Sequence, residues 1–331
     1  MLIPLGELKM KRALFGLIYL SAYKIQLNIV NLKDLTIIEK IDSPSFLQAD
    51  AKSRVFEQDM DKICTALEGF KEKIAEYKIK NYKFYGNEQL IGKLAASFIA
   101  EQIEVRTGLK IEWLNGGQIL YAKVLSGLKS LRESGAADQK QMPTYLLSLG
   151  SAMINLSLFK NNKYVFSWSL PLGPREVQDL TKIANATPTP IDVMNDYLGA
   201  KIGHLARQIK DKNNVRVIIQ HADALSSVFL PQENTTRQIT REEYYNFYNK
   251  IISMPLANIM QTYHLESTVA AHTIPNAISI HQFLSLVNVK TIYITDRSVI
   301  TGLLLKKRLN LVKDLTMILL WLKLRIWQLV I

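Results

Sequence analysis

Residues 146–172 contain the pattern that most clearly suggests chemistry. An apolar run ends in a Leu-Gly-Ser turn at 149–151, a second apolar run leads to a polar turn at 160–163, and a third ends in Ser-Leu-Pro-Leu-Gly at 169–173. A glycine turn between strands lets backbone N–H groups approach a phosphate oxygen, because glycine has no Cβ in the way. The pattern therefore predicts a phosphate-binding turn between two strands.

The elements that would position this turn repeat along the chain. Hydrophobic periodicity and turn residues predict strands and helices in the order βββαβαβα, twice over. In the first half the strands are expected at 13–20, 24–31, 34–41, 80–84 and 109–114, and the helices at 53–77, 88–107 and 117–131. In the second half the strands are expected at 144–149, 153–159, 164–170, 215–219 and 290–294, and the helices at 175–185, 191–211 and 241–263.

This repeated order is typical of an α/β protein with two ribonuclease-H-like domains facing a cleft, the actin-like (ASKHA) arrangement. We expect an N-terminal domain at 10–132, a C-terminal domain at 142–305 and a basic, apolar tail at 306–331. The polar segment 133–141 is the expected boundary. The sequence leaves open whether residues 1–9 and 306–331 are native or reading-frame artefacts, since Met10 is also a candidate start.

Three short segments resemble one enzyme family. The stretch 107–116 (TGLKIEWLNG), the stretch 169–173 (SLPLG) and the stretch 296–305 (DRSVITGLLL) occur in the order and spacing of the exopolyphosphatase/guanosine pentaphosphate phosphohydrolase (Ppx/GppA) family. The resemblance implies hydrolysis of a terminal phosphoanhydride, with glycine-turn amides and Mg²⁺ neutralising the phosphoryl group and a carboxylate activating water. Mg²⁺ is expected as a cofactor only if the protein is active.

The family's catalytic turn, Ser-Gly-x-Glu-Glu-Ala, matches residues 115–120 of this chain. Its two acids are replaced by Gln118 and Ile119, while Gly116 and Gly117 occupy phosphate-binding positions. A glutamine can orient a water molecule but cannot accept its proton, and an isoleucine can do neither. The resemblance therefore implies that no catalytic residue is intact.

The family's two phosphate turns are depleted in the same way. The first matches residues 19–24, where Tyr19 replaces the acid and Ser21 replaces the glycine. The second matches residues 148–155, where Ser148 and Asn155 replace the two acids. The candidate phosphate-binding residues in this turn are Ser148, Gly150, Ser151 and Asn155. Hard divalent cations prefer carboxylate oxygen, so we expect no metal site. Segments 86–90 and 222–224 have also lost the family's expected polar groups.

Composition limits the partners. The 331-residue chain has a formal net charge of +12, which favours polyphosphate or another polyanion as a ligand. Its one cysteine, Cys64, cannot form an internal disulfide, and we expect a cytoplasmic protein. The five histidines are scattered without a metal-binding spacing.

The apolar framework is intact around sites that have lost their polar groups. This favours a pseudoenzyme, that is, a Ppx/GppA-like protein with impaired catalysis. Such a protein could retain binding of a phosphate polymer or of a protein partner, or form a homodimer. One alternative is an active phosphoanhydride hydrolase that uses other carboxylates, with Glu88, Glu112 and Asp223 as candidates. A second is a peripheral membrane or nucleic-acid binder that uses the basic tail 306–331, a candidate for binding a membrane surface.

Overall fold

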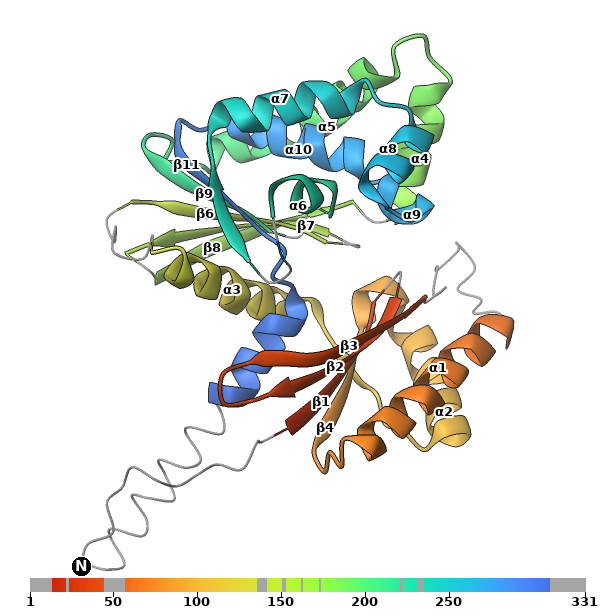
Figure 1. The fold of residues 1–331 in the computed structure, drawn as a ribbon. Coiled ribbons are helices and arrows are strands. Elements are labelled where there is room, and N and C mark those ends of the chain that lie inside the picture. The colour runs from red at the N-terminus through yellow and green to blue at the C-terminus, as the bar shows by residue number, and fades with distance from the viewer. Residues whose placement is uncertain are drawn as a thin grey trace, which may run out of the picture. The chain divides into compact units, whose positions relative to one another are not determined.

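The computed structural model describes residues 14–21, 24–44, 57–135, 142–150, 153–161, 163–172, 174–220, 223–230, 232 and 235–309. These residues form two compact units (Figure 1). Unit 1 contains the described residues up to Ala122 and from Ile300 onward, and unit 2 runs from Lys123 to Val299.

Unit 1 contains a five-stranded sheet in the order β3-β2-β1-β4-β5. The first three strands form an antiparallel meander, and β4 and β5 continue the sheet in parallel with β1. The strands are β1 (Leu14–Leu20), β2 (Lys24–Asn31), β3 (Thr36–Pro44), β4 (Tyr82–Asn87) and β5 (Glu112–Leu114), and the helices are α1 (Glu57–Glu76), the 3₁₀ turn η1 (Glu88–Leu90) and α2 (Gly92–Thr107).

The two faces of this sheet are covered by different helices. Alternate residues of β1, such as Ile18 and Leu20, join the apolar core beneath α1 and α2. The residues between them point to the opposite face, where the Lys307 ammonium lies 5.8 Å from the centre of the Phe15 ring. Lys307 belongs to a helical segment at 299–309, so this segment covers the second face.

Unit 2 contains a six-stranded sheet in the order β10-β11-β9-β6-β7-β8. The strands are β6 (Thr144–Leu149), β7 (Met153–Lys160), β8 (Lys163–Pro171), β9 (Val215–Gln220), β10 (Thr236–Ile239) and β11 (Val289–Thr295). The helices are α4 (Pro174–Asn185), α5 (Pro190–Gly203), the 3₁₀ turn η3 (His204–Arg207), α6 (Asp223–Phe229), α7 (Arg241–Ile252), α8 (Leu256–Tyr263), α9 (Ser267–Ala270) and α10 (Thr273–Ser285).

Five adjacent strands of this sheet, in the order β8-β7-β6-β9-β11, repeat the topology of unit 1, and β10 is added at the edge. This repeat confirms the expected pair of ribonuclease-H-like domains.

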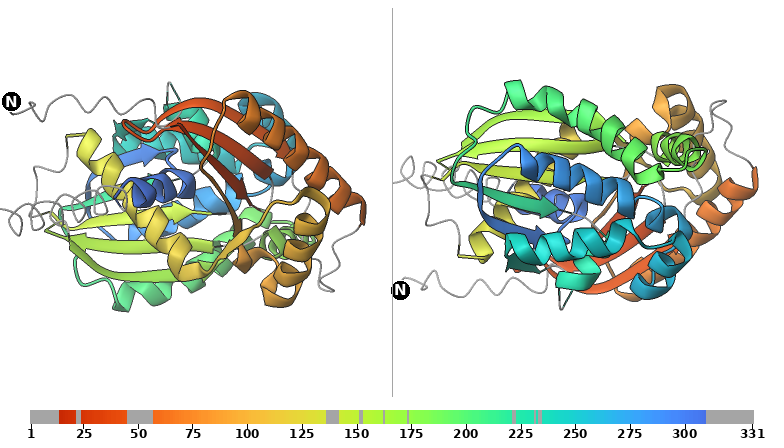
Figure 2. Two further views of the ribbon diagram at one scale, coloured as in Figure 1. Left: turned by 90° about the horizontal axis from the view of Figure 1, so that it is seen from below. Right: turned by 90° about the horizontal axis from the view of Figure 1, so that it is seen from above.

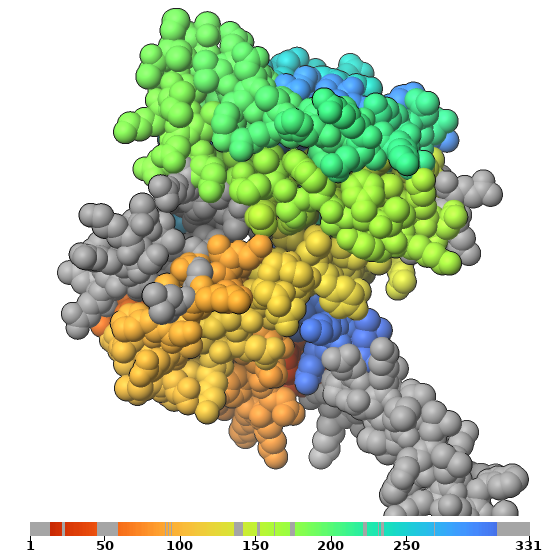
Figure 3. Space-filling model, turned by 180° about the vertical axis from the view of Figure 1, so that it is seen from behind, coloured from red at the N-terminus to blue at the C-terminus, as the bar shows by residue number. Residues whose placement is uncertain are grey.

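Both faces of the six-stranded sheet are also covered. Tyr145 of β6 packs edge-on against Phe283 of α10, with ring centres 5.5 Å apart. Its neighbour Leu146 points the other way, toward Gly127 of helix α3 (Gly116–Glu133). Helices α5, α7 and α10 lie across the first face, as the view from above shows (Figure 2). The edge strand β8 forms part of the molecular surface (Figure 3).

Two predicted helices differ from those observed. The helix expected at 241–263 is two helices, α7 and α8, because Pro255 between them has no N–H and cannot continue a helical hydrogen-bond pattern. The helix expected at 191–211 ends as α5 at Gly203 and continues only as the 3₁₀ turn η3. The short elements α6, α9 and β10 were not predicted, and neither was the longer helix α10.

The compact units also divide the chain at residues other than those expected. The second half of α3, from Lys123, packs in unit 2 rather than in a domain that ends at residue 132. The helical segment 299–309 packs in unit 1, although residues up to 305 were expected in the second domain. Of the expected tail 306–331, residues 310–331 lie outside the described part of the chain.

Gly302 permits the close approach that joins segment 299–309 to α3. A Cβ at this position would overlap the backbone carbonyl of Ala122, so Gly302→Ala forces two helices apart. We expect a loss of about 1–3 kcal/mol in the free energy of unfolding, which urea denaturation would measure. Gly69→Ala in α1 is the matched control, because a Cβ there meets nothing and should slightly stabilise the helix. Equal effects of the two substitutions would contradict the prediction.

Candidate functional site

Residues 115–120, which match the family's catalytic turn, form the N-terminus of α3. The Asn115 side chain accepts a hydrogen bond from the Gln118 N–H at 3.0 Å, and the Gln118 side chain accepts one from the Asn115 N–H at 2.9 Å. This reciprocal pair is a capping box, which satisfies two backbone donors that the first helical turn leaves unpaired. The residue at the position of the family's acid is therefore engaged in starting a helix.

The neighbouring residues do not supply a base either. Ile119 is buried in the apolar interior of unit 1. Gly116 lies directly against η1, since a Cβ on it would be 2.5 Å from the Gln89 amide nitrogen. The structure thus brings segment 86–90 together with Gly116, but Gln89 carries no charge. Gly117 lies beside the Asn115 side chain in the first turn of the same helix.

The first phosphate turn contains buried and locally bonded groups. Tyr19 is buried, and desolvation raises the pKa of its phenol far above its usual value. The Ser21 hydroxyl donates to the Lys24 carbonyl at 2.8 Å, across the turn between β1 and β2. Neither side chain is an acid at neutral pH, so neither can act as the general base that the family requires.

Unit 2 contains a row of polar side chains that crosses its entire sheet. Each residue in this polar row is the register partner of the next on the neighbouring strand, so all its side chains lie on one face. The polar row consists of Thr236, Thr295, Gln220, Ser148, Asn155 and Ser169. It includes two of the candidate phosphate-binding residues, and it lies on the face covered by α3.

One side chain that α3 directs at this row is Lys123. Its ammonium donates a hydrogen bond of 2.7 Å to Asn155 Oδ1, and Asn155 in turn donates to the Ser169 hydroxyl at 2.7 Å. The same ammonium lies 2.7 Å from the point where a Cβ on Gly150 would stand. Lys123 is only 7% exposed, and desolvation lowers its pKa to about 8. A buried cation thus lies directly against Gly150.

Two further polar atoms of the row have no hydrogen-bond partner among the described residues. They are Ser148 Oγ and Gln220 Oε1, on side chains 2% and 1% exposed. The Gln220 amide also donates to the backbone carbonyl of Lys123 at 3.3 Å, which places the amide beside the lysine. Ser151, the remaining candidate, lies outside the described residues.

These residues do not fit Mg²⁺. A magnesium ion requires oxygen ligands, and here an ammonium occupies the space next to Asn155 Oδ1. Within the described part of the chain, no three His, Cys, Asp or Glu side chains form a group that could hold a metal ion.

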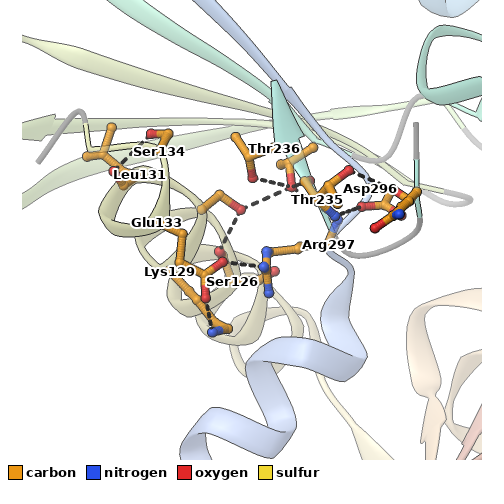
Figure 4. Close-up of polar contacts among 12 residues, drawn as sticks. Ser126, Lys129, Leu131, Glu133, Ser134, Thr235, Thr236, Asp296 and Arg297 are labelled. Carbon is orange, nitrogen blue, oxygen red and sulfur yellow. Dashed lines mark hydrogen bonds and ion pairs between the residues drawn. The ribbon is translucent and has the colours of Figure 1, made fainter. Parts of the chain in front are cut away.

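The far end of the polar row is joined to the C-terminal half of α3 (Figure 4). The Ser130 and Thr295 hydroxyls are 3.0 Å apart, and Thr236 donates to Thr295 at 3.2 Å. Arg297 pairs with Glu133 at the end of the helix. These contacts anchor α3 along the sheet and hold Lys123 in its position under the turn.

The carboxylates proposed as substitutes lie elsewhere or are not described. Glu112 forms a surface ion pair of 3.2 Å with Lys83 on the neighbouring strand. Glu88 begins η1 in unit 1 and is half-buried. The side chain of Asp223 lies outside the described part, as does His221.

Sequence reasoning missed Lys123, although a signal for it was present. Along α3 the positions 119, 122, 123, 126 and 130 follow the spacing of one helical face. Three of these buried positions are polar, namely Lys123, Ser126 and Ser130. A lysine on a buried stripe requires a polar partner, so the pattern pointed to a polar feature on the surface that α3 covers.

Comparison with known proteins shows which structures share this fold. The chain is similar to a Ppx/GppA family member from Aquifex aeolicus, with a TM-score of 0.70 and 16% identity over 90% of this chain and 98% of that one. An exopolyphosphatase from Cytophaga hutchinsonii gives 0.72 and 13% identity over 89% and 97% of the two chains. The sequence matches no protein-family model, and it matches no curated protein. The likeness shows the fold.

Proposed function

We propose that this chain, which has the fold of the Ppx/GppA structures, is a divergent, catalytically impaired relative that binds a phosphate polymer without hydrolysing it. The observation that carries the proposal is the state of the positions where the family has acids. Gln118 closes a capping box, Ile119 is buried in a core, and Asn155 accepts a hydrogen bond from the Lys123 ammonium. None of these groups can accept a proton from water at neutral pH.

Binding is supported by what the same positions retain. Gly150 lies against the buried Lys123 ammonium, and the chain has a net charge of +12. A cationic protein attracts polyanions over distances of about 10 Å at 0.1 M salt. The proposal includes a cytoplasmic location, where polyphosphate and phosphorylated nucleotides would be available.

The test is a titration of the purified protein with long-chain polyphosphate at low and high salt. We expect saturable binding that weakens by about tenfold or more between 50 and 200 mM salt, since attraction between exposed charges is screened. The length of bound polyphosphate remaining after incubation, measured on a gel, should not change. A protein that shows no saturable binding at any salt concentration would contradict the proposal.

The rival readings have less support in the described residues. An active hydrolase would need a carboxylate at one of the turns, and Glu112 is paired on the surface instead. A membrane or nucleic-acid role would depend on the tail, of which residues 310–331 lie outside the described part of the chain. No helix within the described part is long and apolar enough to cross a bilayer.

A further inference from the structure

We infer that the outer edge of β8 is an interface at which two copies of this chain pair as antiparallel strands about a two-fold axis. The inference goes beyond the proposed function and does not depend on phosphate binding. Within the described part of the chain β8 pairs with β7 alone, and its residues 163–169 are exposed or half-buried. The strand forms part of the molecular surface (Figure 3). It therefore presents backbone N–H and C=O groups that no described strand pairs.

This edge lacks the features that usually protect an edge strand. Unpaired backbone groups recruit other strands, and natural proteins discourage such pairing with charged side chains or with very short edge strands. The edge strands β5 and β10 have three and four residues, and the longer β3 carries Glu39, Lys40 and Asp42. Segment 166–170 of the nine-residue strand β8 contains no charged residue. An unprotected edge of this length is expected where another strand covers it.

The pairing of β7 determines which backbone groups of β8 point outward. The Gly150 N–H donates to the Met153 carbonyl at 3.1 Å, so the backbone groups of Met153 point toward β6. These groups alternate in direction along a strand, so every second residue of β7 from Met153 points away from β8. The register partners of these residues are Pro171, Ser169 and Ser167, and their backbone groups therefore point away from the sheet. Pro171 agrees with this direction, because a proline in an edge strand has its N–H side toward solvent.

These outward groups fit one register of self-pairing. With the two-fold axis at Trp168, Ser167 of each copy lies opposite Ser169 of the other, and each such pair can exchange both of its N–H···O=C hydrogen bonds. An axis at Ser167 would instead place Ser169 opposite Val165, which has no register partner on β7 and forms a β-bulge. An axis at Ser169 would place Ser167 opposite Pro171, which has no N–H to donate. The bulge and the proline thus delimit a segment that pairs with itself about Trp168.

The side chains of segment 166–170 are complementary to themselves in the same register. Its sequence, Phe-Ser-Trp-Ser-Leu, has the same pattern of residue types in both directions. On one face Trp168 meets its own copy and Phe166 meets Leu170, and apolar cross-strand pairs of this kind stabilise a sheet. On the other face the hydroxyls of Ser167 and Ser169 meet. A two-fold interface requires a surface that is complementary to itself, so the partner that fits this edge is a second copy of the chain.

The experiment is sedimentation velocity of the full chain over a range of protein concentrations. We expect a reversible dimer with a dissociation constant of about 1–100 μM, since one strand pair buries less area than a standard interface. Ser167→Pro should raise this constant by about tenfold or more, because it removes an outward N–H that the folded monomer does not use. Ser167→Ala loses the 2.6 Å contact between the Ser167 and Ser157 hydroxyls but retains the N–H, and it should still dimerise.

Lys40→Pro is the matched control on the other long edge strand. The Ser21 N–H donates to the Lys24 carbonyl, which fixes the direction of alternate residues of β2, and Lys40 on β3 therefore also points its backbone groups outward. A proline there should leave the dissociation constant within about twofold of the wild-type value. Loss of the dimer in Lys40→Pro, with the dimer intact in Ser167→Pro, would assign the interface to β3 and overturn the inference.

A second measurement requires no variant. Hydrogen exchange of the wild type, compared by mass spectrometry at about 1 and 300 μM, should slow at the higher concentration in peptides that cover β8 and stay unchanged in those that cover β3. A protein that remains monomeric at about 300 μM, or a dimer in which the β8 peptides do not slow, would overturn the inference. Species larger than a dimer would do so too, because pairing about a two-fold axis closes at two copies. These outcomes leave the proposed function standing, since polyphosphate binding is measured separately.

Discussion

Incubated with magnesium and long-chain polyphosphate or guanosine pentaphosphate, the purified protein should release no phosphate above background. The loss of a general base alone lowers a hydrolysis rate by about 10²–10⁴-fold. Here the position of the base is held by Gln118, whose carbonyl oxygen is already hydrogen-bonded to the Asn115 N–H. The loss of metal-bound charge stabilisation lowers the rate further, since Asn155 replaces an acid of the family and accepts a hydrogen bond from the Lys123 ammonium.

The measurement is a colorimetric phosphate assay beside an intact relative, such as the exopolyphosphatase from Cytophaga hutchinsonii. Gln118→Glu is an informative variant, because a glutamate at this position can still close the capping box and the protein should stay folded. It should remain inactive, since unit 2 would still lack its acids. Turnover by the wild type within about tenfold of the intact enzyme, a barrier difference of only about 1.4 kcal/mol, would show that catalysis survives.

The free energy of unfolding of the wild-type protein, minus that of Lys123→Met, should rise by about 3 kcal/mol between pH 7 and pH 10.5. The pKa of Lys123 is lowered to about 8 in the folded protein, from an ordinary value of 10.5, because burial disfavours the charged form. Below pH 8 the lysine is charged in both states, and the folded protein bears the full cost of burying it. Between pH 8 and 10.5 the folded state has released its proton while the unfolded state retains it, so the cost declines as the pH rises.

Urea denaturation of both proteins at several pH values measures this difference. Buried tyrosines also respond to alkaline pH, but they are present in both proteins and cancel in the comparison. Lys182→Met provides the control for loss of one exposed lysine. A difference between wild type and Lys123→Met that stays constant with pH would mean that the ammonium is hydrated in solution, which would also weaken the case for a charge held under Gly150.

The sequence by itself determined the class of fold and most of its elements. Apolar alternation over 24–31 and 153–160 predicts strands, because a period of two places one face in a core, and the continuous apolar run at 14–20 predicts a strand that is buried on both faces. A glycine after an amphipathic run is typical of a helix end, and α2 ends at Gly108, which adopts a φ of 71° that other residues rarely accept. The loss of acids at 118, 119, 148 and 155 was equally readable, since the proton-transfer and metal-binding capacity of a side chain follows from its type.

Only the tertiary structure decided what the substituted residues do. Gln118 and Asn115 are three residues apart, but their reciprocal bonds depend on a helix starting between them. Lys123 meets Asn155 from 32 positions away, and the polar row joins six strands whose order is not their order in the chain. Segment 299–309 packs with Ala122 rather than with its sequence neighbours, because Gly302 allows backbone contact there. Such pairings arise from packing between distant elements, and hydrophobic periodicity contains no information about which elements meet.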